Sequence, residues 1–214
     1  MLTLCWAAKG GNGATVVSCA LAVLAAREHG GSLLVDLGGD APAALGMTEQ
    51  VVPGVHDWVT SSTAPSGALS AIAIATAANV RVIPSGRSTA PADHPRWGEL
   101  GRLLAASDEP VFVDACTPGP PLDLAVVADR RLLVIRPCYL ALRRAVAAAQ
   151  SLTGVVIVNE PGRALRSADV VAALQVPVVA EISCDPAIWR AVDSGLLLTR
   201  LPKALQTSLQ DVVK

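Results

Sequence analysis

A stretch near the N-terminus combines the residue types of an anion-binding loop: Lys9-Gly10-Gly11-Asn12-Gly13-Ala14-Thr15. It follows an apolar run of strand length, Leu2–Ala8, and precedes an Ala-, Val- and Leu-rich run of helical length, Thr15–Arg27. A strand, a glycine turn and a helix start bring several backbone N–H groups together, and the helix N-terminus adds positive potential. The sequence therefore predicts a site for a phosphate-like anion.

Three polar residues stand at the ends of other apolar runs. Asp36, Asp114 and Asn159 each close a run of strand length. Because the carboxyl ends of parallel strands meet at one edge of a sheet, we expect these side chains to lie beside the glycine loop. Four polar features at one edge indicate a ligand site more strongly than any one of them alone.

The elements that must position these residues alternate along the chain. The expected strands after Leu2–Ala8 are Ser32–Leu37, Val80–Pro84, Pro110–Asp114, Leu132–Pro137, Val155–Asn159 and Val176–Ile182. The expected helices after Thr15–Arg27 are Ala43–Gly46, Val55–Ser61, Ala68–Ala78, Trp97–Ala106, Leu122–Ala128, Leu140–Leu152, Ala168–Leu174, Pro186–Ser194 and Leu201–Val213. This alternation indicates an α/β fold with a mostly parallel sheet and helices on both faces. With 214 residues and no low-complexity linker, we expect a single domain over 1–214.

Composition narrows the class of protein. Hydrophobic residues make up 52% of the chain and mean hydropathy is +0.48, which favours a packed core over disorder. No apolar run reaches the ~18 residues of a membrane span, and no leader peptide is evident. The five cysteines and three histidines are scattered, which predicts buried thiols and no metal cluster. These features predict a soluble cytoplasmic protein.

Charge is unevenly distributed along the chain. Residues 1–128 carry six basic and eleven acidic side chains, whereas residues 129–214 carry eleven basic and seven acidic ones. Such asymmetry can mark a nucleic-acid surface, and Arg143, Arg144, Arg163 and Arg166 are candidates for it. Because the basic residues are dispersed, solvated helix faces are the favoured interpretation, and DNA binding stays open.

Three apolar features are assigned to packing. Trp58 is expected to anchor the core. Tyr139 is expected to pack in the core with its hydroxyl in water, and contact with a partner is the alternative. Leu201–Val213 has apolar residues at helical spacing but lacks the basic and aromatic residues of a membrane-targeting helix. We therefore expect it to dock on the body of the domain or on a partner.

Together these stretches resemble the ParA/MinD family, whose nucleotide-dependent dimers position DNA, division proteins, pili and other cargo. The glycine loop resembles the family's deviant P-loop, KGGxGK[ST]. Leu33–Leu37 resembles the second strand, which ends in a DxD pair, and Val111–Asp114 resembles the Walker B strand. Ala128–Pro137 and Val156–Asn159 resemble the strand after switch II and the strand that ends near the adenine. The resemblance covers nearly the whole chain and implies a P-loop NTPase-like fold.

The resemblance also implies roles for single residues and a cofactor, ATP with Mg²⁺. Lys9 would reach a phosphate across a homodimer, while Gly10, Gly11 and Gly13 would let the backbone wrap the phosphates. Thr15 and Asp114 would hold the Mg²⁺. Asn159 would recognise the base and Asp36 would be the first acid of the DxD pair.

Two departures from the family pattern affect the expected chemistry. Ala14 occupies the place of the lysine that contacts the phosphates, and Gly38 that of the acid that orients the attacking water. A lost charge-assisted phosphate contact costs a few kcal/mol of binding or transition-state energy. Pilus-localising members similar to TadZ and CpaE also carry GA for GK in this loop; an actinobacterial ParA-like member is another possible match.

The sequence therefore predicts a dimeric positioning or scaffold protein, with a protein partner and a degenerate nucleotide site that hydrolyses ATP weakly or not at all. The alternative is an active Mg-ATP-dependent ATPase in which Lys9 and Asp40 replace the lost groups. A third hypothesis is a dinucleotide-binding oxidoreductase, because Gly11-Asn12-Gly13 and Asp36 imitate a Rossmann fingerprint. Against it, Val16 stands where a small residue is needed. The glycine loop as a purely structural turn is the remaining alternative.

Overall fold

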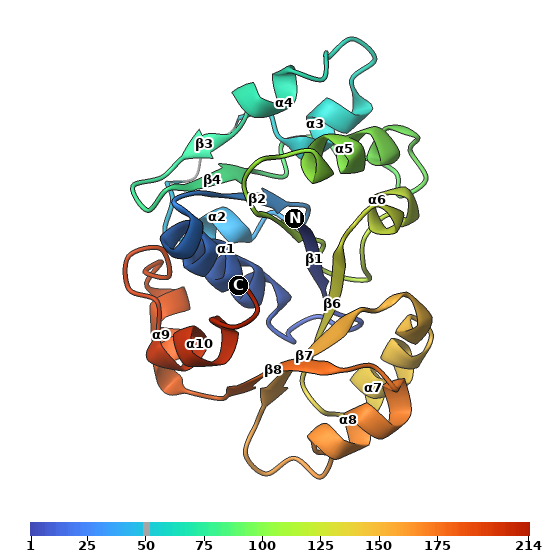
Figure 1. Cartoon of the computed structure of the whole chain (residues 1–214), viewed down its shortest axis with the longest axis vertical. Helices are drawn as coiled ribbons and strands as arrows, with labels where there is room; N and C mark the ends of the chain where they lie inside the picture. Colours follow the sequence, from blue (N-terminus) through green and yellow to red (C-terminus); the bar gives the residue numbers. More distant parts are fainter. Residues whose placement is uncertain (49–51) are drawn as a thin grey trace.

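A computed structural model describes residues 1–48 and 52–214, and its centre is one eight-stranded sheet (Figure 1). The strand order is β3-β4-β2-β5-β1-β6-β7-β8, and every neighbouring pair is parallel except β3 with β4. The strands are β1 (Leu2–Trp6), β2 (Ser32–Asp36), β3 (Ile74–Ala75), β4 (Val80–Ile83), β5 (Val111–Asp114), β6 (Arg130–Ile135), β7 (Gly154–Asn159) and β8 (Val178–Ser183). The expected mostly parallel sheet is confirmed.

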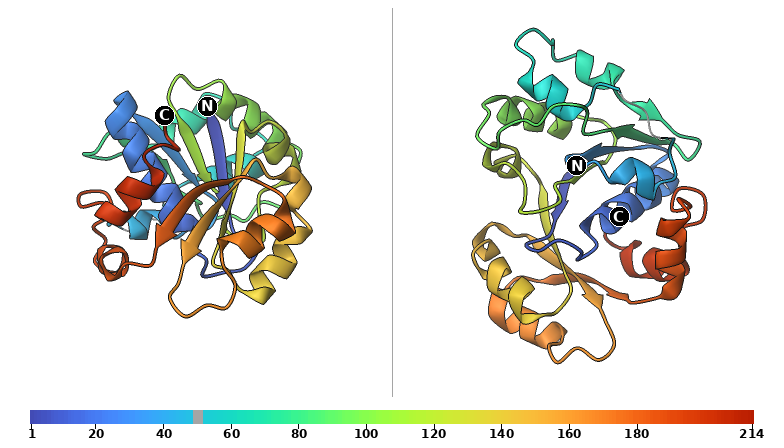
Figure 2. Two further views of the ribbon diagram at one scale, coloured as in Figure 1. Left: turned by 60° about the horizontal axis from the view of Figure 1, so that its bottom comes forward. Right: turned by 180° about the vertical axis from the view of Figure 1, so that it is seen from behind.

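Helices cover both faces of this sheet (Figure 2). One face carries α1 (Ala14–His29), α2 (Ala41–Ala44), α9 (Pro186–Asp193) and α10 (Lys203–Leu209). The other carries α3 (Val55–Thr60), α4 (Ala68–Ala71), α5 (Arg96–Ala105), α6 (Leu122–Val126), α7 (Tyr139–Val146) and α8 (Ser167–Leu174), with a 3-10 turn at Ala149–Ser151. None of the described helices is both long and apolar enough to span a bilayer.

Alternation along the central strands explains the two layers. In β1, Cys5 packs with the α1 side, whereas Leu4 and Trp6 pack with the other side. Successive strand side chains point to opposite faces, so a strand buried on both faces must be apolar throughout. All five residues of β1 are buried. Trp58 is 3% exposed in the second layer, which confirms it as a core anchor.

The strand order places β1 between β5 and β6, at the centre of the sheet. In a Rossmann sheet of order 3-2-1-4-5-6 the first strand pairs with the second. Here β5 separates β1 from β2. The topology therefore differs from that of the dinucleotide-binding fold that the glycine pattern imitates.

Two predicted helices end earlier than expected. The helix expected over Ala68–Ala78 is wrong beyond Ala71, because the chain turns into β3, where Ile74 pairs with Val82 of β4. Isoleucine in an Ile-Ala alternation suits a strand, and pairing with an open edge overrides the helical propensity of alanine. The helix expected over Leu140–Leu152 breaks after Val146 and continues as the 3-10 turn.

The C-terminal segment docks on the body of the domain, as expected, although its helix is shorter than the predicted Leu201–Val213. Leu205 and Leu209 of α10 are buried with α1, and Val212 and Val213 continue the same contact. The His29 ring donates from Nε2 to the Val213 carbonyl at 2.8 Å. This end of the chain is therefore part of the core layer.

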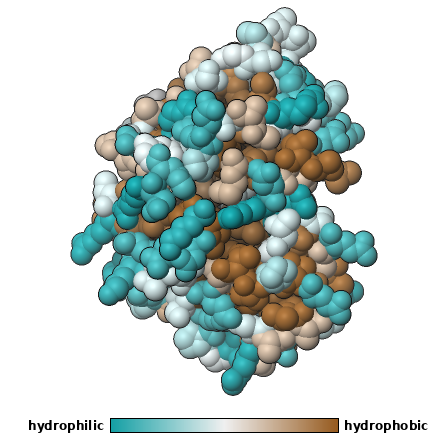
Figure 3. Space-filling model, in the orientation of Figure 1, coloured by the Kyte–Doolittle hydropathy of each residue, from teal (hydrophilic) through white to brown (hydrophobic). Residues whose placement is uncertain are grey.

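Tyr139 does not pack in the core: its exposed fraction is 73%. It begins α7, whose buried positions are Ala141 and Ala145, so the helix turns Tyr139 outward. Leu122 and Val126 of α6 are similarly exposed, and Figure 3 shows apolar surface over α6 on the right-hand side of the view. The prediction for Tyr139 was wrong because helical phase, rather than side-chain type, decided its burial.

Candidate functional site

The loop between β1 and α1 has a backbone that glycine adopts most readily. Gly11 and Gly13 have φ of 78° and 95°, in the left-handed region. Gly13 precedes α1, and no side chain caps this 16-residue helix, so the first N–H groups of α1 lack an intrahelical acceptor. A Cβ added at Gly10, Gly11 or Gly13 would meet no described atom within 4 Å beyond its chain neighbours. The loop therefore leaves open space beside its glycines and precedes a helix start without a side-chain cap, two features of anion sites.

The side chains of the loop contribute little charge. Ala14 is buried at the start of α1. Lys9 is half-buried and its Nζ donates to the Gly10 carbonyl at 3.3 Å. Asn12 is 2% exposed, and its side-chain nitrogen has no hydrogen-bond partner among the described residues. Lys9 is the cationic side chain of the loop, and Asn12 has a buried side-chain N–H donor without a partner in the described part of the chain.

Asp36 lies at the predicted edge and holds the turn that follows β2. Its Oδ1 accepts from the backbone N–H groups of Gly38 and Gly39, both at 2.9 Å, and its Oδ2 accepts from Ala41 at 3.1 Å. Burial raises the pKa of this carboxyl, and the three backbone donors lower it in part. Both oxygens of Asp36 are therefore engaged by the protein itself.

Asp114 is paired in register with Asp36 across β5 and β2. One of its oxygens accepts from the Cys116 N–H at 3.3 Å, while Oδ2 is buried without a partner in the described chain. Burial raises the pKa of Asp114 to about 6, the adjoining Thr15 side chain acts in the opposite direction, and the charge of Asp36 raises the pKa further. A buried carboxylate oxygen beside a hydroxyl at the start of α1 is a pair of ligands that Mg²⁺ accepts.

The thiols near this pair are not nucleophiles. Burial raises the pKa of Cys5 to about 12 and that of Cys116 to about 11, and it raises that of Cys19 as well. Only a thiolate attacks or binds a soft metal, so thiol chemistry at this edge is disfavoured. The described residues contain no group of three metal-ligating side chains. A divalent cation here would therefore need ligands from water or a bound phosphate in addition to Asp114 and Thr15.

Gly38 is tightly enclosed by a neighbour. A Cβ at this position would overlap the sulfur of Cys116, which belongs to the loop after β5. Asp40, two residues further on, is exposed and immediately precedes α2. Its charge nevertheless raises the pKa of both Asp36 and Asp114, so it acts on the same cluster. The position of Gly38 cannot hold an acid unless Cys116 moves.

Asn159 ends β7 at the same edge, and it is engaged with β8. Its Nδ2 donates to Glu181 Oε2 at 2.7 Å, and Ser167 donates to the same oxygen at 2.8 Å. Asn159 does not line the cavity beside the loop. The structure therefore places the predicted residues at one edge of the sheet, with Thr15, Asp36 and Asp114 clustered and Asn159 farther along.

Sequence reasoning missed a cavity of about 110 Å³ that opens beside Gly13, between α1, the ends of β7 and β8, and α9. Its polar lining includes Arg136 and Asp185, and Trp189, with 47% of its surface exposed, lines the same space. Arg136 donates to Glu160 at 2.9 Å, and its Nε is buried without a described partner. A signal was available, because Arg136 lies near the end of the expected strand Leu132–Pro137 and Asp185 follows the expected strand Val176–Ile182, so both belong to the same edge.

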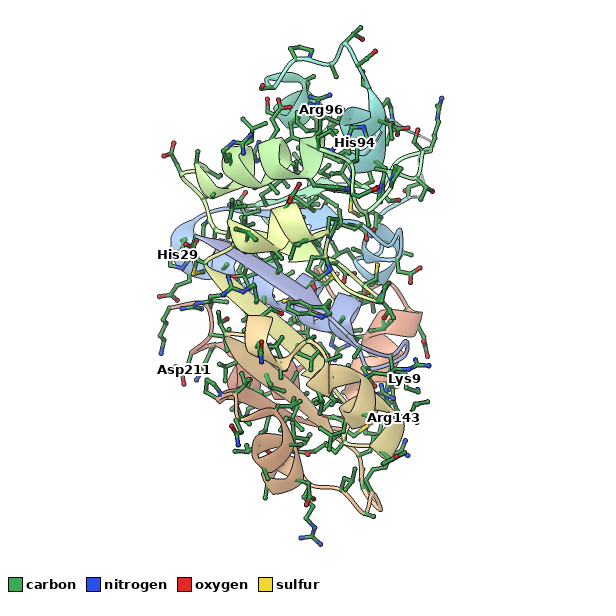
Figure 4. All side chains as sticks on the ribbon, turned by 90° about the vertical axis from the view of Figure 1, so that its right-hand side faces the viewer. Lys9, His29, His94, Arg96, Arg143 and Asp211 are labelled. Atoms are coloured by element: carbon green, nitrogen blue, oxygen red, sulfur yellow. The ribbon has the colours of Figure 1, made fainter. Side chains whose placement is uncertain are left out.

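Figure 4 views the molecule from its right-hand side in Figure 1 and places Lys9 and Arg143 of α7 near each other at the edge where the loop lies. The site therefore combines free helix N–H groups, one loop lysine, a buried carboxylate with an unused oxygen, and an adjoining cavity. This arrangement suits an anionic ligand with a divalent cation and a partly apolar, planar group.

No family profile and no curated protein matches this sequence. Solved structures do share its fold. A ParA family ATPase from Chlorobium tepidum has TM-score 0.82 at 18% identity, covering 99% of this chain and 96% of that one. MinD from Pyrococcus horikoshii with Mg-ADP has TM-score 0.75 at 18% identity, covering 100% and 95%. The MinC:MinD complex of Aquifex aeolicus has TM-score 0.79 at 16% identity, covering 99% and 93%. The chain therefore has the MinD/ParA P-loop NTPase fold.

Proposed function

We propose that this chain is a ParA/MinD-like positioning or scaffold protein whose nucleotide site is degenerate and hydrolyses ATP weakly or not at all. It acts as a single domain, in the cytoplasm, as a homodimer with a protein partner. The observation that carries the proposal is a glycine turn, with left-handed Gly11 and Gly13, that leads into an uncapped helix start at Ala14, which supplies no charge to a phosphate.

Several features of the site favour a retained ability to hold Mg-nucleotide. The unused Asp114 oxygen and the adjoining Thr15 suit the cation, and the open N–H groups of the loop suit the phosphates. The cavity beside Gly13 suits part of a base. Bound Mg²⁺ would supply charge compensation to the phosphates, while this chain's residues would orient them. The Mg-ADP in the Pyrococcus structure, which has the same fold, supports this choice of ligand.

Other features oppose efficient hydrolysis. Removing the lysine expected at position 14 costs a few kcal/mol of phosphate interaction, and about 1.4 kcal/mol corresponds to a tenfold change in rate. Gly38 lacks the carboxylate that would orient water, and the Cys116 sulfur fills the space beside it. The two losses lie in different loops and are independent. A scaffold that keeps the architecture without the turnover explains both.

The second candidate is a working ATPase in which Lys9 and Asp40 compensate. It is favoured by the influence of the Asp40 charge on Asp114, and by the position of Lys9 in the loop itself. The oxidoreductase is disfavoured, because β5 lies between β1 and β2 and because Val16 follows the glycines where a small residue is needed. DNA binding by the exposed Arg143 and Arg144 is not favoured, because the basic residues are dispersed along the chain.

The decisive experiment is calorimetry with ATP and Mg²⁺ on the wild type, on Ala14→Lys and on Ala147→Lys. Ala147 is exposed beyond α7, so its substitution adds the same charge away from the loop. We expect Ala14→Lys to gain at least about tenfold in affinity, or about 1.4 kcal/mol, and Ala147→Lys to gain nothing. No gain at position 14 would show that the loop is not a P-loop relative.

A steady-state phosphate-release assay separates the scaffold from the ATPase. The scaffold predicts turnover that is slow or equal to the rate of a blank. Turnover in the wild type that is abolished by Lys9→Ala would replace the scaffold proposal with the working ATPase.

A further inference from the structure

We propose that Arg136 contacts the phosphate groups of the bound ligand and supplies the positive charge that Ala14 does not. This inference rests on the proposed function, because it concerns the same nucleotide site. It goes further by assigning the phosphate-binding cation to a residue outside the glycine loop. Arg136 follows β6, has a buried Nε without a described partner, and lines one cavity with Gly13, the residue before α1.

The end of β6 carries Arg136 to the level of the glycine loop. β6 pairs in parallel with β1, and Trp6 and Leu133 are register partners. Lys9 and Arg136 each lie three residues beyond this pair, so both follow their strands at the same edge of the sheet. Figures 1 and 2 show the blue loop between β1 and α1 beside the end of β6.

Strand alternation turns Arg136 toward α1. Val134 packs in the layer that contains α1, whereas Ile135 packs in the opposite layer. Because successive side chains of a strand point to opposite faces, the residue after Ile135 faces the α1 layer again. The cavity agrees with this direction, since Arg136 lines it together with Gly13 and with Val17 of α1. The side chain therefore lies on the face of the sheet from which α1 begins.

Most of the hydrogen-bonding capacity of Arg136 is unused. An arginine side chain carries five N–H donors. Within the described residues Arg136 makes one hydrogen bond, from Nη1 to Glu160 Oε1 at 2.9 Å, and its Nε has no partner. A buried donor without an acceptor costs free energy, which an accepting ligand oxygen removes. The planar guanidinium can offer two parallel N–H groups to one phosphate.

Glu160 can be held without Arg136. Its Oε2 accepts from Arg163 Nε at 2.6 Å. The pKa of Glu160 is lowered, first by the hydrogen bond from Arg163 and then by the charges of Arg136 and Arg163. Two arginines around one carboxylate leave one positive charge uncompensated. Arg163 therefore keeps Glu160 paired when Arg136 turns to a phosphate.

The other charged residues of the cavity confine an anion to the side of Arg136. Arg136 is the sole basic side chain among the described residues that line this cavity. Asp185 and Asp193 line it from the two ends of α9, and Asp185 Oδ1 accepts from the Ala187 N–H at 2.8 Å. These acids repel an anion, whereas Arg136 and the N-terminus of α1 attract it. The phosphates are therefore the part of a nucleotide that Arg136 suits.

The test measures binding to the full chain by calorimetry with two probes. The probes are ATP and tripolyphosphate, each with Mg²⁺, and tripolyphosphate has no base. We expect Arg136→Met to weaken both probes by the same factor, at least about tenfold. Arg136→Gln should have the same effect, although its amide can still donate to Glu160. Circular dichroism should show both variants folded.

Two variants assign the effect to the position of Arg136. Arg163→Met is the matched control, because it removes the same charge from the same carboxylate but Arg163 does not line the cavity beside Gly13. It should change either affinity by less than about twofold. Adding Ala14→Lys to Arg136→Met should recover at least about tenfold in affinity, because the lysine returns the missing cation to the loop.

Four results would overturn this inference while leaving the nucleotide site in place. The first is wild-type affinity for both probes in Arg136→Met and Arg136→Gln. The second is equal weakening by Arg163→Met, which would make the effect one of general charge. The third is a loss confined to ATP, which would assign Arg136 to the base. The last is binding of Mg-ATP by Ala14→Lys but not by the wild type, which would show that Arg136 does not replace the lysine.

Failure of the proposed function gives a different pattern. In that case neither the wild type nor Ala14→Lys binds Mg-ATP or tripolyphosphate. The role of Arg136 falls with it, and the arginine is then an ion-pair partner of Glu160 alone.

Discussion

Replacing Asp114 by Asn should stabilise the protein at neutral pH and leave its stability unchanged in acid. The carboxyl is buried, and its pKa rises from 3.8 to about 6 on folding. Between these two values the folded chain binds the proton more tightly than the unfolded chain, so stability falls as pH rises through this window. The pKa difference corresponds to about 3 kcal/mol, at about 1.4 kcal/mol per unit. An amide stays neutral throughout and avoids this loss.

Urea unfolding of the wild type, Asp114→Asn and Asp93→Asn at several pH values measures this effect. Asp93 lies exposed in a loop, so its substitution is a matched control. We expect Asp114→Asn to exceed the wild type by up to about 3 kcal/mol above pH 6 and to match it near pH 4. A difference between Asp114→Asn and the wild type that is the same at both ends of the range would refute the assignment of a raised pKa to Asp114. If Asp93→Asn also gained stability as pH rises, burial would not be the cause of the effect at Asp114.

Two further predictions concern stability. Gly13→Ala should lower the free energy of unfolding in urea by about 1–2 kcal/mol, because the φ of Gly13, 95°, is left-handed. Gly10→Ala is the control, since Gly10 has room for a Cβ and no such φ, and it should be neutral or slightly stabilising. Equal losses in the two variants would contradict the backbone argument. Arg96→Ala should lower the free energy of unfolding by about 2–4 kcal/mol, because the guanidinium donates to three backbone carbonyls and lies 3.8 Å from the ring centroid of Trp58. Arg102 is exposed, so Arg102→Ala should change the melting temperature little. A similarly small shift for Arg96→Ala would show that solvent replaces those contacts.

The placement of the site could be predicted from the sequence because it follows from local pattern. Each of Asp36, Asp114 and Asn159 closes an apolar run, and parallel strands deliver such ends to one edge. The glycines of the loop have the same local origin, since a left-handed φ between a strand and a helix requires them. The strands other than β3, the mostly parallel sheet and the glycine loop at its centre were therefore predictable.

The remaining features depend on contacts between distant segments, which no local pattern contains. Tyr139 is exposed because of the phase of α7 against the sheet, and α4 ends where it does because the chain pairs with the open edge of β4. The overlap that a side chain at Gly38 would make with Cys116 joins loops after two different strands.

The sequence by itself determined a strand, glycine turn and helix with polar groups at the ends of the strands, because periodicity and backbone sterics act over a few residues. Only the tertiary structure decided what those groups do. It engages Asp36 with its own turn, leaves one oxygen of Asp114 without a partner, and opens a cavity lined by Arg136 and Asp185 beside Gly13. The physical reason is that hydrogen bonding, burial and pKa depend on neighbours that only packing brings together.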